Sequence, residues 1–327
     1  MAPSSSTRLG IRPTVSVIIP NYNHARFLKQ RIDSVLEQSF ADLQVIILDD
    51  CSTDNSREVI ESYRHHPRVE HIVYNETNSG STFAQWQRGL ALATGKYVWI
   101  AESDDYAAPE FLATLVPLLD ANPSAVMAFT GSHMVGPDGQ PVTGMDWDRY
   151  RKGQPDTELY SGRELIIRKL LWTSDVYNAS MVLFRRDTAP DIEPAQLTMR
   201  YCGDWLFWVN TALCGDAIEV RRKLNYFRQH DAKVSPGASR AGLYFTEGLP
   251  IMARIADALD FSPRQRAMLA GRTWKRLGKF PQLMAAKRDD VMTLLDRLSP
   301  NAASHRRKLI ALYEADKYLN FTHLQPR

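Results

Sequence analysis

Short apolar runs alternate with amphipathic stretches over the first 130 residues of the chain. The run Val15 to Ile19 is rich in β-branched residues and stops at Pro20, which is typical of a strand buried on both faces. Apolar residues at helical spacing follow from 25 to 38, and a second buried run at 45–48 ends at Asp49-Asp50. Strand, helix and strand in this order predict a βαβ unit, the building block of a parallel sheet.

The same alternation continues to residue 130 and predicts an open α/β sheet. Further helices are expected at 56–63, 82–93 and 109–119, and further strands at 71–74, 97–101 and 125–130. We expect a mostly parallel sheet flanked by helices, with ligands beyond the carboxyl ends of its strands. Residues 131–160 are rich in Gly, Pro and Asp, and predict a loop that either folds over a substrate or merely connects two elements. Beyond it we expect a helix at 162–171, a strand at 179–184, a helix opening near Asp204 and helices over 248–320.

The bulk composition predicts an enzyme-sized globular protein. The chain has 327 residues, of which 44% are hydrophobic and 24% charged. No run of 18 apolar residues occurs, and the first ten residues lack the apolar stretch of a signal peptide, so we expect a cytoplasmic protein. Three cysteines without a CxxC pair favour reduced thiols, with a nucleophilic Cys202 as the alternative.

Charge is unevenly distributed along the chain. The net charge is +3, made up of −5 over residues 1–250 (25 Lys and Arg, 30 Asp and Glu) and +8 over residues 251–327 (15 and 7). A basic C-terminal segment suggests peripheral contact with an anionic membrane, where lipid-linked acceptors reside; the alternative is a solvated face of a helical subdomain. No nucleic-acid-binding pattern occurs, so nucleic acid is not an expected partner.

Three acidic clusters carry the candidate chemistry. Asp50 follows the second buried strand, where a carboxylate accepts hydrogen bonds from a base or a ribose, whereas Ser52 and Asp54 are explained as helix caps. Glu102, Asp104 and Asp105 follow the strand at 97–101, and crowded carboxylates favour a hard cation such as Mg²⁺ or Mn²⁺; the alternative is that Asp104 caps a helix or is merely solvated.

The third cluster opens an aromatic helix with Asp204. This carboxylate is placed to take a proton from an incoming hydroxyl, while Trp205 or Trp208 stacks against a sugar. A plain helix N-cap at Asp204 is the alternative.

Together these motifs resemble the family 2 glycosyltransferases of the GT-A fold, from about Thr14 to Ser235. The markers are Val15 to Asn23 (VSVIIPNYN), Asp49 to Ser56 (DDCSTDNS), Asn78-Ser79-Gly80, Gly95 to Val98 (GKYV), Ser103-Asp104-Asp105 and Gly203-Asp204. The resemblance implies a nucleotide-diphosphate sugar as donor and Mn²⁺ or Mg²⁺ as cofactor. The processive members' Gln-x-x-Arg-Trp motif is absent from this sequence, which implies that a single sugar is added.

The resemblance also assigns roles to single residues. Asp50 is similar to the acid that binds the nucleobase, Asp105 to the metal ligand and Asp204 to the catalytic base of an inverting displacement. Asp104 would face the donor sugar or ribose, and His230 resembles a further contact to metal or diphosphate. The remaining nucleotide-sugar-binding residues implied by the motifs are Pro20, Tyr22, Asn23, Asn78 and Gly80.

The chain departs from the family pattern at two places. Phe83-Ala84-Gln85-Trp86 stands where Ala-Arg-Asn is common, which removes an arginine expected at the donor's base and phosphates. Glu102 stands where an aspartate is common and still supplies an acid.

The sequence therefore predicts three segments and one function. Residues 1–13 form a lead-in, 14–235 a glycosyltransferase domain (14–125 nucleotide-binding, 126–235 acceptor-binding) and 236–327 a basic helical subdomain. The predicted function is inverting transfer of one sugar from a UDP- or dTDP-type donor to a hydroxyl of a carbohydrate or lipid-linked acceptor in surface polysaccharide or glycolipid assembly.

Rival functions are a non-catalytic sugar-nucleotide-binding or scaffold protein and a sugar nucleotidyltransferase. The latter would be expected to carry a Gly-rich basic loop where Asn21-Tyr22-Asn23-His24 stands. A dinucleotide-dependent oxidoreductase would need GxGxxG there, which is absent.

Overall fold

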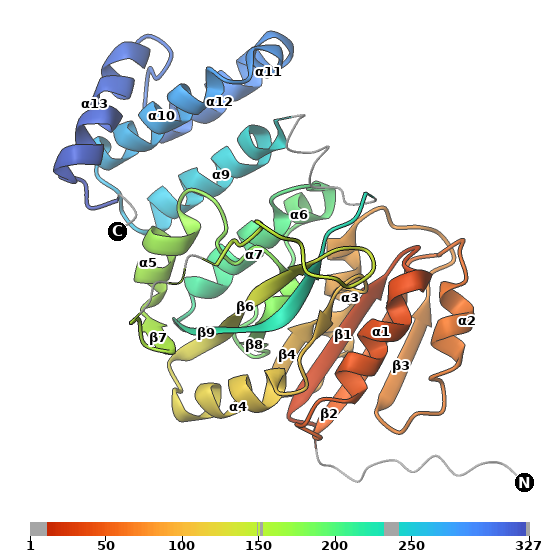
Figure 1. Ribbon diagram of the computed structural model, residues 1–327. Helices are drawn as coiled ribbons and strands as arrows, with labels where there is room; N and C mark the ends of the chain where they lie inside the picture. Colours follow the sequence, from red (N-terminus) through yellow and green to blue (C-terminus); the bar gives the residue numbers. More distant parts are fainter. Residues whose placement is uncertain (1–11, 149, 151–152, 232–241, 325–327) are drawn as a thin grey trace, which may run out of the picture.

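A computed structural model describes residues 12–148, 150, 153–231 and 242–324 (Figure 1). Within these residues the strands form one nine-stranded sheet in the order β3-β2-β1-β4-β8-β6-β9-β5, with β7 also pairing with β9. The strands are β1 (Val15–Asn21), β2 (Leu43–Asp49), β3 (Val69–Tyr74), β4 (Tyr97–Ile100), β5 (Tyr106–Ala107), β6 (Ala125–Val135), β7 (Thr157–Tyr160), β8 (Val182–Arg185) and β9 (Asp216–Arg228). The predicted boundary at 235/236 lies outside the described residues.

Helices cover both faces of this sheet. The N-terminal ones are α1 (Ala25–Leu36), α2 (Ser56–Glu61), α3 (Thr82–Leu92) and α4 (Phe111–Ala121). They are followed by α5 (Gly162–Leu165), η1 (Ile166–Leu170), η2 (Ala179–Met181), α6 (Pro194–Thr198) and α7 (Gly203–Ala212). The C-terminal helices are α9 (Leu243–Ala258), α10 (Pro263–Leu277), α11 (Pro281–Ala286), α12 (Arg288–Leu298) and α13 (Arg306–Leu319).

The predicted α/β sheet with flanking helices and C-terminal helices is confirmed. The first half of the sheet is parallel: β1 pairs with β2 and β4, and β2 pairs with β3. Each of these strands is linked to the next along the chain by a crossover that contains a helix, as parallel pairing requires. The buried apolar runs of β1 and β2 lie at the centre of this half and are covered on both faces. Beyond β4 the sheet is mixed, since β8 runs antiparallel to both β4 and β6, whereas β6 and β9 are parallel.

Two expected elements differ in detail from the prediction. The strand expected at 179–184 begins as a 3₁₀ turn, and only Val182–Arg185 pairs in the sheet. The helix expected at 162–171 is one α-helical turn with a capping box at Ser161, followed by a π-helical segment. No described helix is long and apolar enough to cross a membrane.

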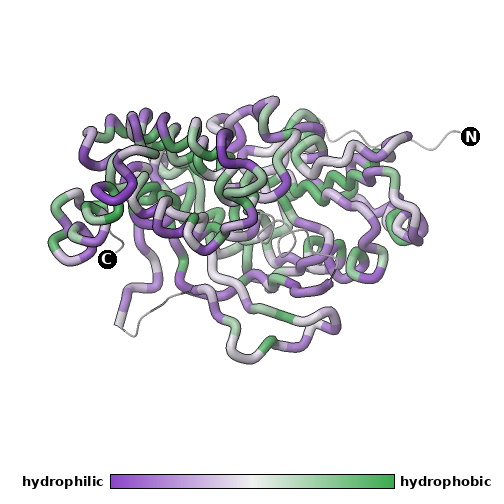
Figure 2. Tube along the Cα trace, turned by 90° about the horizontal axis from the view of Figure 1, so that it is seen from above, coloured by the Kyte–Doolittle hydropathy of each residue, from purple (hydrophilic) through white to green (hydrophobic). Residues whose placement is uncertain are grey.

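The C-terminal helices share a core with one face of the sheet. Buried residues of α9, α10 and α12 belong to the same apolar cluster as Trp86 of α3 and Trp208 of α7. The helices alternate between hydrophobic and hydrophilic residues (Figure 2), so their apolar faces turn inward. The basic segment therefore packs on the α/β part through a continuous core, and in Figure 1 α9 runs alongside α7.

Candidate functional site

The loops after β1 and β2 are fastened to each other at the carboxyl edge of the sheet. Asn23, in the left-handed region with φ 55°, accepts the backbone N–H of Thr53 at 2.7 Å, and its own N–H donates to Ser52 Oγ at 2.9 Å. Asn23 thus braces these loops. Pro20 is buried inside β1, whereas Tyr22 just beyond is 46% exposed, so of this pair only the Tyr22 ring is open to a ligand, and nucleotide binding by either residue stays a prediction.

Asp50 anchors the loop that follows β3. Its Oδ1 accepts Asn75 Nδ2 at 2.6 Å, the Ser79 N–H at 2.9 Å and Gln85 Nε2 at 2.9 Å, and its Oδ2 accepts Ser79 Oγ at 2.7 Å. The buried carboxylate therefore shapes the Asn78-Ser79-Gly80 turn. Its contact with a base stays a prediction, as does donor binding by Asn78 and Gly80.

Gly80 requires glycine because its φ is +68°, a conformation that side chains rarely adopt. Its N–H donates to Asn78 Oδ1 at 2.5 Å, and its carbonyl oxygen accepts Arg200 Nη1 at 2.6 Å. The turn is thereby linked to the segment that leads into α7.

Asp105, the residue that the sequence predicts to hold the metal ion, is engaged by protein donors, and its metal role stays a prediction. The residue is 0% exposed, and its carboxylate accepts Asn178 Nδ2 at 2.7 Å, Ser180 Oγ at 2.9 Å and the Arg228 N–H at 2.9 Å. A carboxylate with these donors is a structural hub that joins the acidic loop to β9 and to the turn before β8.

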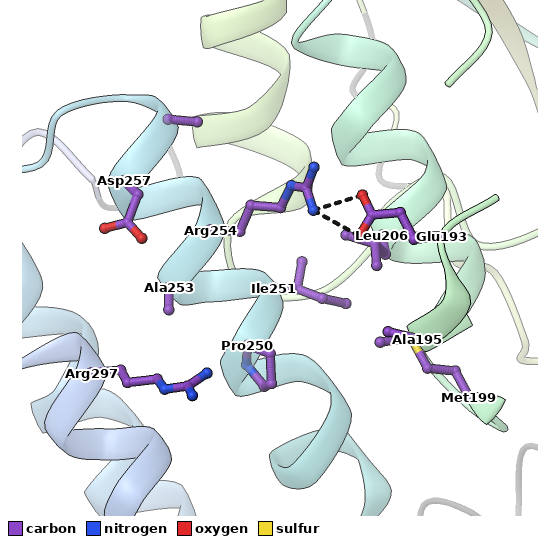
Figure 3. A pocket seen from close by; sticks show the side chains of 11 residues that line it. Glu193, Ala195, Met199, Leu206, Pro250, Ile251, Ala253, Arg254, Asp257 and Arg297 are labelled. Carbon is purple, nitrogen blue, oxygen red and sulfur yellow. Dashed lines mark hydrogen bonds and ion pairs between the residues drawn. The ribbon is translucent and has the colours of Figure 1, made fainter. Parts of the chain in front are cut away.

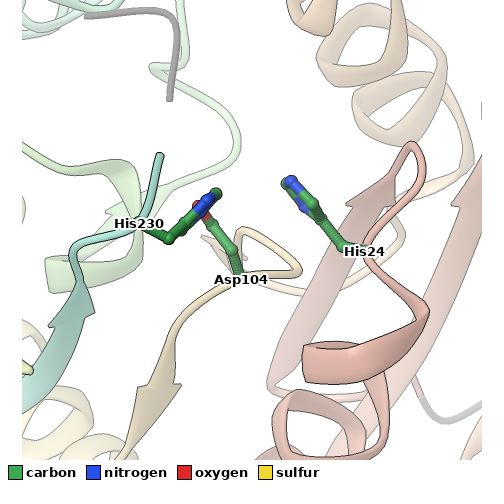
Figure 4. A group of neighbouring side chains, drawn as sticks. All are labelled: His24, Asp104 and His230. Carbon is green, nitrogen blue, oxygen red and sulfur yellow. The ribbon is translucent and has the colours of Figure 1, made fainter. Parts of the chain in front are cut away.

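The metal-capable position belongs to its neighbour Asp104. Among the described residues, His24, Asp104 and His230 each offer one ligand atom, and these atoms lie within 4.8 Å of one another (Figure 4). His230 Nε2 is 3.0 Å from Asp104 Oδ2, and the His24 and His230 rings meet edge to face at 5.6 Å. Asp104, predicted to face the donor sugar or ribose, thus lies with His230 in a group that could hold a metal ion, and both roles stay predictions.

The donor set of this trio fits a divalent cation. Burial is the main cause that lowers the pKa of His24, with Asp104 opposing it and His230 adding to it, so the imidazole is neutral and keeps a lone pair. Its Nδ1 lies 2.9 Å from Ser103 Oγ, which leaves Nε2 for a ligand. His230 Nδ1 is buried and has no hydrogen-bond partner among the described residues. Two imidazoles and a carboxylate suit Mn²⁺, and the same residues accept Mg²⁺ through the carboxylate.

Crowding of acids makes the same region favourable for a cation. Burial, followed by repulsion from Asp104, raises the pKa of Glu102 to about 8, although Trp86 Nε1 donates to this carboxylate at 2.9 Å. Behind it, the buried Arg31 donates from Nε to the Glu102 carbonyl oxygen at 2.8 Å, while its Nη1 and Nη2 have no hydrogen-bond partner in the described part of the chain. One buried guanidinium thus faces three acids.

Asp204 stands in the first turn of α7. Burial raises the pKa of its carboxyl to about 6, and the Trp205 N–H, which donates to Oδ1 at 2.7 Å, opposes that shift. Gly203 lets this helix approach α3, because an added Cβ would lie 2.4 Å from the Phe83 ring. Asp204 is therefore held beside α3, the helix that follows the Asn78-Ser79-Gly80 turn. Its raised pKa suits a general base that works near neutral pH.

Trp205 and Trp208, predicted to stack against a sugar, are both buried in the core and offer no exposed ring face to an acceptor. Trp208 is 0% exposed among Trp86, Phe184 and Phe207, and Trp205 is 3% exposed, with Nε1 donating to the Leu170 carbonyl oxygen at 2.6 Å. Cys202 is buried as well, and burial raises the pKa of its thiol, so the alternative of a nucleophilic thiolate is not supported.

A pocket lies elsewhere, between α6, α7, α9 and α12 (Figure 3). It is lined by Pro250, Ile251 and Arg297, and by Arg254, whose guanidinium pairs with Glu193 at 2.7 Å. None of the acids discussed above lines it, so we do not assign it to the donor site.

Sequence reasoning missed the contribution of His24. This residue follows the Asn21-Tyr22-Asn23 turn directly, and a histidine just beyond a strand end was the available signal. Its partners were not visible, because Asp104 and His230 are remote in sequence and meet it only in the fold.

A family model described as glycosyl transferase family 2 matches residues 16–192, more than half of the chain. The chain belongs to glycosyl transferase family 2. TuaG of Bacillus subtilis, named for teichuronic acid biosynthesis, is 36% identical over 131 residues, 40% of this chain and 51% of TuaG. The hyaluronan synthase of Pasteurella multocida is 30% identical over 161 residues, 49% of this chain and 16% of that protein. The matches thus span about half of TuaG and a small part of the synthase.

Solved structures support the GT-A fold of this family 2 member. Staphylococcus aureus TarS 1–349 in complex with UDP-GlcNAc is 20% identical with a TM-score of 0.62, and the match covers 94% of this chain and 92% of that one. The mannosyltransferase PcManGT from Pyrobaculum calidifontis, solved with GDP-Man and Mn²⁺, is 17% identical with a TM-score of 0.51, covering 96% and 84%. At these identities the likeness concerns the fold, and it extends over the C-terminal helices.

Proposed function

We propose that this protein is an inverting glycosyltransferase that moves one sugar from a UDP- or dTDP-linked donor to an acceptor hydroxyl. The observation that carries the proposal is that the structure holds both a metal-capable trio (His24, Asp104, His230) and a separate, half-buried carboxyl, Asp204, whose pKa is about 6. Displacement at an anomeric carbon needs both parts, since the leaving diphosphate gains charge while the attacking hydroxyl loses a proton.

Asp204 acts as the general base in this proposal. With a pKa of about 6, the carboxyl is mostly ionised at neutral pH and is basic enough to accept a proton. The acceptor oxygen attacks the anomeric carbon, its proton passes to Asp204, and the bond from that carbon to the diphosphate oxygen breaks. The sugar is transferred with inversion, and the nucleoside diphosphate leaves with the electron pair.

Mn²⁺ or Mg²⁺ bound to the trio would neutralise the diphosphate. Asp104 and His230 supply the ligands that come from opposite halves of the chain, and His24 adds a second imidazole. Tyr22, the exposed ring at the end of β1, is the side chain that would stack on the base, beside the turn anchored by Asp50.

The donor and acceptor classes rest on the relatives. TarS was solved with UDP-GlcNAc, which favours a UDP-sugar as donor. TuaG and the hyaluronan synthase are named for teichuronic acid and hyaluronan, which favours a carbohydrate or lipid-linked acceptor. We place the reaction in the cytoplasm, at the inner face of the membrane, where Arg307 and Lys308 of the basic segment are exposed for contact with anionic lipid.

A donor screen by thermal shift tests the function. UDP-, dTDP- and GDP-sugars are added with MnCl₂, and a donor at about 100 times its Kd stabilises the fold by about 2.7 kcal/mol. Slow release of free sugar from the same donor then separates an enzyme from a non-catalytic binder. Turnover of a nucleoside triphosphate and a sugar 1-phosphate, with no donor hydrolysis, would instead indicate a nucleotidyltransferase.

A further inference from the structure

A carboxylate of the C-terminal helix α9 binds the backbone that leads into α7. Glu247 Oε1 accepts the N–H of Arg200 at 3.0 Å, and its Oε2 accepts the N–H groups of Tyr201 and Cys202 at 2.9 and 2.8 Å. We call residues 200–202 the 200–202 loop. One side chain thus satisfies three successive amides, and such charge-assisted hydrogen bonds are stronger than neutral ones.

The 200–202 loop determines where Asp204 stands. Cys202 is the N-cap residue of α7 and makes no side-chain cap, so the start of this helix depends on Glu247 instead. The carboxylate also lies at the positive end of the helix dipole, where a negative charge is stabilising. Only Gly203 separates Cys202 from Asp204, hence a shift of the loop displaces Asp204 with it.

The same loop contacts the Asn78-Ser79-Gly80 turn through Arg200. Its backbone is held by Glu247, while its exposed guanidinium donates to the Gly80 carbonyl oxygen at 2.6 Å. The Gly80 turn is anchored on its other side by Asp50. A chain of direct hydrogen bonds therefore runs from α9 through the 200–202 loop to the turn assigned to donor binding.

Close packing makes α9 a rigid support for this chain of contacts. An added Cβ at Gly248 would lie 2.8 Å from the Trp205 ring, and Tyr244 stacks parallel to that ring with centroids 6.1 Å apart. The helix is tied a second time by Arg254, which pairs with Glu193 before α6. Position 247 is consequently fixed relative to α7 by packing on both sides.

We infer that Glu247 is a positioning residue of the transferase site, which aligns Asp204 with the donor turn by holding the 200–202 loop. The inference rests on the proposed function and deepens it, because it makes a helix beyond the family match at 16–192 part of the active site.

Charge gives the inference a signature that a merely structural contact lacks. Burial is the main effect on the Asp204 pKa and raises it. The backbone N–H groups of Trp205 and Asp204 lower this pKa, and the negative charge of Glu247 raises it. The Cys202 thiol, also close by, is uncharged at neutral pH because burial raises its pKa. Removal of the Glu247 charge therefore lowers the pKa of the base.

The test compares Glu247→Gln with Arg254→Ala, which removes a different polar tie of α9 and leaves the hydrogen bonds of the 200–202 loop in place. Backbone hydrogen exchange of the full chain is measured first. Glu247→Gln should lose protection at residues 200–202, whereas Arg254→Ala should keep it. UDP-GlcNAc hydrolysis with MnCl₂ should then be slower in Glu247→Gln by at least about tenfold, since small misplacements of reacting groups cost that much or more. The acid limb of its pH–rate profile should move to lower pH.

Unchanged protection at 200–202 in Glu247→Gln, or hydrolysis equal to that of Arg254→Ala, would overturn the inference. Wild-type protein that hydrolyses no nucleotide sugar would instead refute the proposed function, and the exchange data would still show whether Glu247 holds the loop. Should Glu247→Gln not fold, Glu247→Asp keeps the charge but shortens the side chain by one methylene, and it should show the same local loss of protection in a folded protein.

Discussion

The Nε2 atom of His230 lies 3.0 Å from Oδ2 of Asp104, although 126 positions of chain separate the two residues. β9 ends at Arg228, whose N–H donates to Asp105. This contact brings His230, two positions further along the chain, next to the acidic loop. The buried Asp105 thus places His230, and the less buried Asp104 faces it. Neighbouring aspartates thus differ in environment, since Asp105 is fully buried and Asp104 belongs to the metal-capable trio.

Asp104→Asn and Asp105→Asn should fail in different ways. Asp104→Asn is expected to lower Mn²⁺ affinity by more than about tenfold with little change in stability. Asp105→Asn should cost about 3 kcal/mol of unfolding free energy, because three buried donors lose their charged acceptor. Titration calorimetry with MnCl₂ and urea unfolding measure the two effects. Loss of Mn²⁺ binding in a fully stable Asp105→Asn protein would instead indicate that Asp105 holds the metal ion.

Tyr22 and Trp208 provide a second contrast. Tyr22→Ala should weaken UDP binding by about 1–3 kcal/mol if the exposed ring stacks on the base. Trp208→Phe should lower the melting temperature while the KM values for donor and acceptor stay near those of the wild type, because this ring is buried in the core. A raised acceptor KM in a folded Trp208→Phe protein would instead indicate that Trp208 contacts the acceptor.

Gly203→Ala tests the approach of α7 to α3. The new methyl group would lie 2.4 Å from the Phe83 ring, so we expect a loss of about 1–3 kcal/mol in stability and lower turnover. Phe83→Leu in the same protein makes room and should restore part of both. Gly144→Ala is the matched control for packing, since nothing lies within 4 Å of its Cβ position, although its φ of +77° adds strain of its own. A Gly203→Ala protein as stable as the wild type would exclude the close contact.

Turnover should depend on pH through Asp204. The raised pKa of about 6 means that the base is protonated below that pH and ionised above it. The rate at saturating donor should therefore fall as pH drops through about 6 and level off toward pH 7 and above. Binding of UDP and Mn²⁺ is followed at each pH, so that a loss of ligand is separated from a loss of the base. A rate that stays constant from pH 5 to 8 would argue against Asp204 as the base.

Much of the fold could be predicted from the sequence, because its first half is built from local patterns. The apolar runs of β1 and β2 and the amphipathic α1 were visible as buried strands and a helix, and their bounds agree within two residues. β9 was missed, because Arg221, Arg222 and Lys223 interrupt its apolar pattern. Arg221 and Lys223 find acidic partners only in the fold, Arg221 with Glu158 of β7.

The site was predictable as a set of motifs but not as a geometry. Strand ends pointed to Asp50 and Asp104, and a helix start pointed to Asp204, as candidate residues, since ligands of α/β sheets gather beyond the strand ends. Periodicity could not decide which of Asp104 and Asp105 turns inward, because that depends on the partners Asn178 and Ser180 far along the chain. The burial of Trp208 likewise depends on α3 and β8, which contact it in space alone.

The most direct test of the account is the single-turnover rate of Asp204→Asn at saturating nucleotide sugar and Mn²⁺. General-base help is typically worth about 10²–10⁴-fold, so the account predicts a loss of that size with donor affinity close to that of the wild type. A near-normal rate in a folded Asp204→Asn protein would contradict it.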